Sequence, residues 1–338
     1  MDPTSDQMIS VGLVFGLMML SAVRGMLNRT GLIAAAIVGL TVSLFGHWTW
    51  LTILISFLAV GSLATLWKYE EKAALRLAED NKGARGWRNV MANGGVASLV
   101  AIANFALDQP EWAYLAACAS ISVAASDTLA SEIGSLDSRT RSIINLEAVP
   151  AGTNGGMSVT GTFAAFGGAV LIASLSVSLA SITDVEVPLL TMLVVLTAIG
   201  WLGCQVDSIL GALFENKGLI GKHTVNFLAT LSGALMAIFF HIRFLEEEAF
   251  VKPKEYDLVE LTEARGLNAG PIRGGVRGVT VVEVKSAFGS NFSTSRRYFC
   301  SRLYQWPRGG RIWPWPRTQH PPKSQYFPSW DGRDTRTS

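Results

Sequence analysis

Two acidic side chains within a helical pattern are the first candidates for functional residues in this sequence. Asp127, Thr128, Ser131 and Glu132 follow directly on an apolar run. On a helix they fall at about 0°, 100°, 40° and 140°, so they form one polar arc. Each ionised carboxylate costs roughly 2.5–3.5 kcal/mol at the centre of a membrane helix, whereas a leucine contributes only about 0.3–0.6 kcal/mol in favour of insertion. The arc therefore indicates either a polar site inside a helical bundle, facing ions or phosphate, or a helix end at the membrane interface.

A glycine-rich turn follows the arc and leads into another apolar run. Its residues are Gly152-Thr153-Asn154-Gly155-Gly156. Backbone N–H groups in such a turn point freely at anions, and the N-terminus of the next helix adds a favourable dipole. The turn is thus a candidate phosphate site, although Gly156, Gly161, Gly167 and Gly168 are equally consistent with a face for close helix packing.

A further carboxylate, Asp207, is followed by Ser208 late in another apolar run. Carboxylates from two helices suit Mg²⁺, which takes one or two of them together with substrate phosphates, so Asp127 and Asp207 are the candidate metal ligands. Arg24 is a candidate for neutralising phosphate charge. The alternatives are an interfacial Asp207 paired with Lys217 or Lys222, and an Arg24 that only anchors the chain on the positively charged side of the membrane.

The composition indicates which kind of protein positions these residues. The chain has 338 residues, of which 49% are hydrophobic and 16% charged, with a mean hydropathy of +0.33. Soluble domains carry about 25% charged residues, so this is a polytopic membrane protein. The three cysteines and four histidines show no metal-ligand spacing, and nothing indicates nucleic-acid binding.

The fold class expected is an all-α, polytopic helical membrane bundle of about eight transmembrane helices, formed by residues 1–244. The eight apolar runs are Met8–Val23, Gly31–Gly46, Trp50–Trp67, Val90–Leu107, Trp112–Glu132, Ser158–Ala180, Pro188–Phe214 and Thr224–Ile242. Several are shorter than the 20 or so residues of a perpendicular span, which suggests either a thin, ER-like membrane or helices broken around an internal site. Residues 245–338 are polar, basic and rich in Pro and Trp, and are expected to form a disordered tail.

Basic residues predict the orientation in the membrane. The first, third, fifth and seventh connections between spans carry twelve Lys or Arg residues, whereas the N-terminus and the other connections between spans carry none. The positive-inside rule places the odd connections in the cytosol and the N-terminus on the non-cytosolic side. The carboxylates and the glycine turn then lie at the cytosolic face.

Three segments resemble the motifs of the DUF92 family of integral membrane proteins. They are Ser126–Gly134, Val149–Gly156 and Val206–Ala212, in the family's order, and the resemblance runs from about Val11 to Arg243. The family includes transmembrane protein 19 and a plant phytyl-phosphate kinase. The chain departs from the family pattern in the short connection Glu215–His223.

For one branch, the resemblance implies phosphorylation of a prenyl monophosphate by a nucleoside triphosphate. By analogy Asp127, Glu132 and Asp207 would be catalytic and hold metal, while Thr153, Asn154 and the glycines would cradle phosphate beside Ser131. The leading hypothesis is therefore a prenyl- or phytyl-phosphate kinase-like transferase with an isoprenoid phosphate substrate, using Mg²⁺ at the cytosolic face. The alternatives are a transporter and a structural or regulatory membrane protein without catalysis.

Overall fold

A computed structural model describes residues 3–79, 83–183, 185, 187–245, 254–256 and 279–281. Seven of its helices are long and apolar enough to cross a membrane, and an eighth apolar helix, α2, has 17 residues. The expected all-α, polytopic bundle is confirmed, and each expected apolar run corresponds to a helix whose ends differ by a few residues. The bounds of the first five helices are α1 Pro3–Arg24, α2 Arg29–Phe45, α3 Trp48–Leu66, α4 Tyr69–Ala74 and α5 Trp87–Ala106.

In the second half of the bundle, two helices end in a short π-helical turn. Helices α8 and α9 each continue into one π-helical turn, η2 and η3. The bounds are α6 Trp112–Gly134, α7 Val159–Ala180, α8 Leu189–Leu210, η2 Gly211–Glu215, α9 Lys222–Phe240 and η3 His241–Leu245. Strands β1 (Arg141–Ser142) and β2 (Gly156–Met157) form an antiparallel pair in the connection between α6 and α7.

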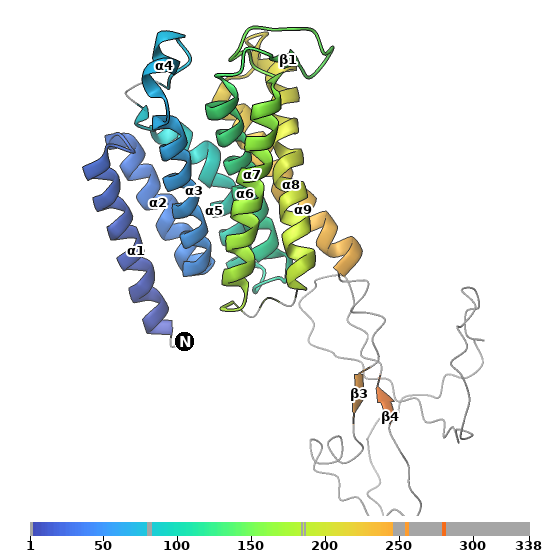
Figure 1. Cartoon of the computed structure of the whole chain (residues 1–338). Coiled ribbons are helices and arrows are strands. Elements are labelled where there is room, and N and C mark those ends of the chain that lie inside the picture. Colours follow the sequence, from blue (N-terminus) through green and yellow to red (C-terminus); the bar gives the residue numbers. More distant parts are fainter. Residues whose placement is uncertain are drawn as a thin grey trace, which may run out of the picture. The chain divides into compact units, whose positions relative to one another are not determined.

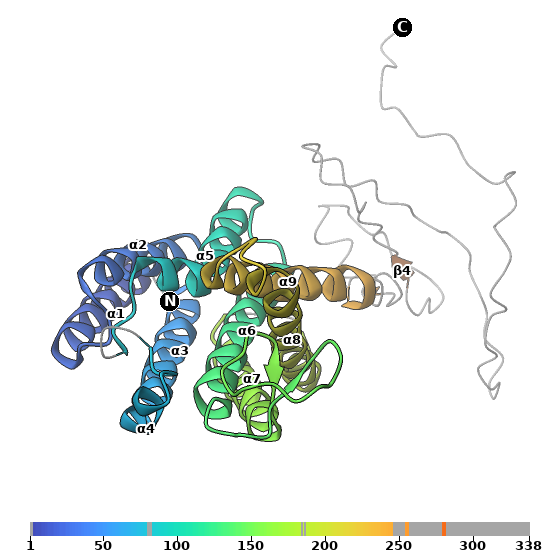
Figure 2. The same ribbon diagram turned by 90° about the horizontal axis from the view of Figure 1, so that it is seen from above.

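Helix α6 lies at the centre of the bundle, packed against α3, α5, α7, α8 and α9 (Figures 1 and 2). Of its 23 residues, 17 are buried, and most of these are Ala, Ser or another small residue. Small side chains let neighbouring helices approach closely, which is how helices associate where lipid removes the hydrophobic driving force. Helix α6 therefore holds its polar arc in the interior of the bundle.

Close packing between α6 and α7 depends on glycine. A Cβ atom on Gly134 would lie 2.8 Å from the Cα of Gly161, and one on Gly168 would lie 2.9 Å from the carbonyl oxygen of Ala125. Gly161 and Gly168 thus form the helix-packing face that their spacing suggested. Gly167 has open space around its Cβ position.

Most of residues 245–338 lie outside the described residues, so the expectation of a disordered tail stays a prediction. Within this segment β3 (Lys254–Tyr256) and β4 (Val279–Val281) form an antiparallel pair. The pair belongs to a compact unit separate from the helical bundle.

Candidate functional site

A cavity of about 530 Å³ is lined in part by the α4–α5 and α6–α7 connections. These connections lie at the end of the bundle that carries α4 and β1 (Figure 1). The volume of the cavity is within the range of small-molecule sites. Helices α6, α7, α8 and α9 and the turn η2 also contribute lining residues. All but one of the residues predicted from the sequence line the cavity, namely Asp127, Ser131, Glu132, Thr153, Asn154, Gly155, Gly156 and Asp207.

Asp127 of α6 and Asp207 of α8 meet in this cavity, and their carboxyl groups interact directly. Asn226 of α9 donates from Nδ2 to Oδ2 of Asp127 at 3.4 Å. Oδ2 of Asp207 is buried and has no hydrogen-bond partner within the described part of the chain. Two adjacent carboxylates repel one another unless a proton or a cation lies between them. This pair therefore fits a divalent cation.

A pair of carboxylates is compatible with Mg²⁺. Among the described residues no group of three or more His, Cys, Asp or Glu side chains is arranged to hold a metal ion. Mg²⁺ is commonly bound by one or two carboxylates, with waters and substrate phosphates completing its shell. Asp127 and Asp207 would supply that number of protein ligands.

Glu132 lies in the same cavity, but both of its carboxylate oxygens are already bonded. Lys72 donates from Nζ to Oε2 at 2.6 Å, and Thr65 donates from Oγ1 to Oε1 at 2.7 Å. Lys72 is fully buried and also donates to the carbonyl oxygens of Ala64 and Thr65. Of the three acidic residues predicted for the site, Glu132 is thus the one that ties α4 and the end of α3 to α6.

The glycine-rich turn forms another wall of the cavity. Its own hydrogen bonds leave the N–H groups of Asn154 and Gly155 without an acceptor in the described residues. Ser158 caps α7 by accepting from the N–H of Gly161. Free N–H groups beside a helix N-terminus favour an anion such as phosphate, so the geometry of the turn is compatible with its expected role.

Gly155 sits where the turn contacts η2, and Gly155→Ala tests that contact. Its φ is +75°, and a Cβ atom would lie 2.5 Å from the Cβ of Ala212 and 2.6 Å from the carbonyl oxygen of Ser208. We expect Gly155→Ala to lower the free energy of unfolding by about 2–4 kcal/mol, from left-handed strain and collision together. Chemical denaturation in detergent micelles would measure it.

Gly218→Ala is the matched control for this prediction. Gly218 has a φ of +69° but nothing within 4 Å of its Cβ position. The control is expected to lose only about 1–2 kcal/mol through backbone strain. Equal losses in the two variants would contradict the close contact at Gly155.

Several residues of the cavity were not recognised as site residues in the sequence. Lys222 at the start of α9 forms an ion pair with Glu79 of the α4–α5 connection, and both line the cavity. Burial raises the pKa of Glu79, but the ammonium of Lys222 and the charge of Arg85 hold it below its usual value. Arg76 and His223 also line the cavity. A charged pair 143 residues apart leaves no local pattern in the sequence.

The structure also bears on the alternatives for Asp207 and Arg24. Lys222 is bonded to Glu79 rather than to Asp207. Arg24 is exposed at the end of α1 and does not line the cavity. Its position agrees with the alternative role as a positively charged anchor.

Comparison with known proteins assigns the chain to a family. Residues 12–234, which include the whole of α6, the glycine-rich turn and Asp207, match the family described as "Integral membrane protein DUF92". The chain belongs to this family. The resemblance found in the three motifs is thereby confirmed.

Relatives of this DUF92 protein occur in archaea, bacteria and plants. An uncharacterized membrane protein of Methanocaldococcus jannaschii is 34% identical over 213 residues, which cover 63% of this chain and 84% of the relative. An uncharacterized membrane protein of Synechocystis sp. is 32% identical over 195 residues, covering 56% and 73%. Protein VTE6, chloroplastic, of Arabidopsis thaliana is 30% identical over 223 residues, covering 63% and 64%. No solved structure matches the chain.

Proposed function

We propose that this DUF92 protein phosphorylates an isoprenoid monophosphate to the diphosphate, with a nucleoside triphosphate as donor and Mg²⁺ as cofactor. The observation that carries the proposal is the pair Asp127 and Asp207, which meet from two helices in a cavity walled by the glycine-rich turn. The relationship to VTE6 and the resemblance to a family that includes a phytyl-phosphate kinase support the choice of substrate.

The chemistry is a single group transfer. An oxygen of the lipid monophosphate attacks the γ-phosphorus of the nucleotide, and the bond from that phosphorus to the β,γ-bridging oxygen breaks, which releases the nucleoside diphosphate. Phosphoryl transfer is catalysed mainly by positioning and by stabilising charge on the phosphate oxygens. Mg²⁺, when bound by Asp127 and Asp207, would neutralise part of that charge.

The other cavity residues have roles that follow from their charge and bonding. The free N–H groups of Asn154 and Gly155 would bind phosphate oxygens, with the side chains of Thr153 and Ser131 nearby on the cavity wall. Lys222 would add positive charge opposite the carboxylates. The basic connections at this end of the bundle would place the site in the cytosol, where nucleotides are found.

Incubation of the purified protein in lipid nanodiscs with γ-labelled nucleotide tests the proposal. The acceptors are farnesyl, geranylgeranyl and phytyl monophosphate, each with and without Mg²⁺. We expect labelled isoprenoid diphosphate that depends on Mg²⁺ and is absent when the free isoprenol replaces the monophosphate. No diphosphate from any combination of four nucleoside triphosphates and these acceptors would overturn the proposal.

A further inference from the structure

The cavity that contains the glycine-rich turn holds more negative than positive charge. Five carboxylates line it, and of these Glu132 is bonded to Lys72 and Glu79 to Lys222. The other three make no ion pair within the described part of the chain, namely Asp127, Asp207 and Glu215. The charge of Glu215 acts on both aspartates, and like charges at close range repel one another. A cation in this part of the cavity is therefore favoured.

Lys222 is a cation whose charge acts on all three of these carboxylates. It is the first residue of α9, and Asn226 lies one turn further along the same face of that helix. Asn226 donates to Oδ2 of Asp127 at 3.4 Å. The face of α9 that carries Lys222 is thus directed toward the acidic pair.

The ion pair with Glu79 leaves part of Lys222 available to a ligand. An ammonium group has three N–H donors, and one of them donates to Oε1 of Glu79. Among the described residues this ammonium forms no second hydrogen bond. The side chain of Lys222 is 52% exposed, so a ligand in the cavity can reach its remaining donors.

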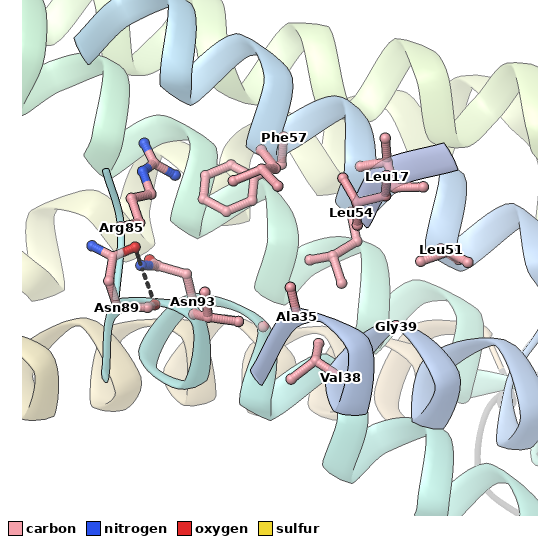
Figure 3. A pocket seen from close by; sticks show the side chains of 14 residues that line it. Leu17, Ala35, Val38, Gly39, Leu51, Leu54, Phe57, Arg85, Asn89 and Asn93 are labelled. Atoms are coloured by element: carbon pink, nitrogen blue, oxygen red, sulfur yellow. Dashed lines mark hydrogen bonds between the residues drawn. The ribbon is translucent and has the colours of Figure 1, made fainter. Parts of the chain in front are cut away.

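Glu79 also has another cation beside it. Arg85 lies in the α4–α5 connection, at one end of a small neighbouring cavity together with Asn89 and Asn93 (Figure 3). The charge of Arg85 acts on Glu79, as the charge of Lys222 does. Glu79 therefore does not depend on Lys222 alone for its counter-charge, and the charge of Lys222 remains effective in the cavity.

We infer that Lys222 opposes the binding of a free divalent cation at Asp127 and Asp207, and favours the same cation in complex with a polyphosphate. A free metal ion brings two positive charges close to the ammonium, and the two cations repel each other. A polyphosphate supplies oxygens that coordinate the metal and others that accept hydrogen bonds from Lys222. The ligand that this cavity selects is then the metal–polyphosphate complex rather than either component alone.

This inference deepens the proposed function and rests on it, because the divalent cation at Asp127 and Asp207 belongs to that proposal. It adds that the metal and the nucleotide enter the cavity together. The role of Lys222 precedes any transfer of phosphate, so it can be measured by binding alone, without the lipid substrate.

Calorimetric titrations of the protein in nanodiscs of zwitterionic lipid test the inference. The probes are Mn²⁺, which prefers the same oxygen ligands as Mg²⁺, inorganic tripolyphosphate, and the equimolar complex of the two. We expect the native protein to bind the complex at least about tenfold more tightly than either component, and Asp127→Asn to bind Mn²⁺ much more weakly. Native protein that binds the complex no more tightly than Mn²⁺ alone, or unchanged Mn²⁺ binding in Asp127→Asn, would overturn the inference.

Lys222→Met is expected to shift two of these affinities in opposite directions. The binding of Mn²⁺ alone should strengthen by about 3- to 10-fold, because a positive charge that is partly screened by solvent is removed. The binding of the complex should weaken by about tenfold, because one charge-assisted contact with phosphate is lost. A purely structural role of Lys222 would weaken both. Any combination other than the opposite shifts would overturn the inference.

Lys217→Met and Lys222→Arg are the matched controls. Lys217 lies in the connection that precedes α9, but it is exposed and does not line the cavity, so the loss of its charge should leave both affinities unchanged. Lys222→Arg keeps the charge, so the complex should remain the tighter ligand. Shifts in Lys217→Met equal to those in Lys222→Met would contradict the inference.

A double variant keeps the test decisive if Lys222→Met does not fold. Glu79→Gln combined with Lys222→Met leaves neither member of the ion pair charged without the other. The double variant is expected to lose the preference for the complex over Mn²⁺ alone. A preference equal to that of the native protein would overturn the inference.

The outcomes separate this inference from the proposed function. Opposite shifts in Lys222→Met, with no transfer of phosphate from any nucleotide to any acceptor, would leave the role of Lys222 standing and overturn the kinase activity. Transfer to an isoprenoid monophosphate without these shifts would overturn the role of Lys222 and leave the kinase activity.

Discussion

Asp127→Asn and Asp207→Asn are each expected to lower kcat/KM for lipid-phosphate phosphorylation by about 10²–10³ or more. Each substitution removes one of the two carboxylates proposed to hold Mg²⁺, and with it charge stabilisation at the transferring phosphoryl group. The loss should be smaller at high Mg²⁺ concentration if weakened metal binding is its cause. Initial rates measured across a range of Mg²⁺ concentrations would show this.

A loss of activity through misfolding is excluded by measuring stability in the same variants. Two adjacent carboxylates destabilise the apo protein by repulsion, so each Asn variant is expected to unfold at the same temperature as the native protein or higher. The native protein should gain thermal stability from Mg²⁺, because a ligand that binds only the folded state stabilises it. Both variants should lose that gain.

Asp108→Asn is the matched control for the acidic pair. Asp108 is exposed in the connection between α5 and α6, away from the cavity, and its φ of +59° is one that Asn tolerates well. The activity and the Mg²⁺-dependent stabilisation of Asp108→Asn are expected to equal those of the native protein. Native turnover in Asp127→Asn would remove the role assigned to that residue.

Lys72→Met is expected to lower the free energy of unfolding by about 3–5 kcal/mol, the largest stability effect in the bundle that we predict. The substitution leaves the carboxylate of Glu132 buried without its charged partner. Removing one member of a buried ion pair costs more stability than replacing both members by apolar side chains. Lys72→Met also removes the donor to the carbonyl oxygens of Ala64 and Thr65 at the end of α3. Denaturant unfolding in micelles, followed by tryptophan fluorescence, would measure the change.

The control for Lys72 lies four residues earlier. Lys68 pairs with Glu71 at 2.9 Å, but both side chains are about half exposed. An exposed pair contributes about 0–1 kcal/mol, so Lys68→Met should change stability little. The double variant Lys72→Met with Glu132→Leu should recover much of the loss, since neither charge is then buried alone. A loss of equal size in Lys68→Met would contradict the buried pair's importance.

The buried pair also explains how the cavity keeps its shape. Lys72 lies in α4 and Glu132 ends the polar arc of α6, so their bond fixes α4 against the central helix. Glu79 and Lys222 join the α4–α5 connection, which follows α4, to α9. The connection therefore forms part of the wall of the cavity between two fixed points.

The sequence by itself determined the helices and eight of the residues that line the cavity. Lengths of apolar runs predict spans because lipid offers the backbone no hydrogen bonds, so each segment must satisfy its own N–H and C=O groups within one helix. The cost of burying Asp127 and Asp207 in such runs marked them as site residues, and the structure brings both into one cavity with the glycine-rich turn. These are local properties of composition and spacing.

Only the tertiary structure decided which charges are bonded to one another. Glu132 carried the same sequence signal as Asp127, yet it is bonded to Lys72, 60 residues away, whereas Asp127 meets Asp207. Lys222 was predicted only as a possible partner of Asp207, yet it lines the cavity and is bonded to Glu79. The physical reason is that helical periodicity gives the face on which a side chain lies, while the rotation and neighbours of that helix depend on packing against distant segments.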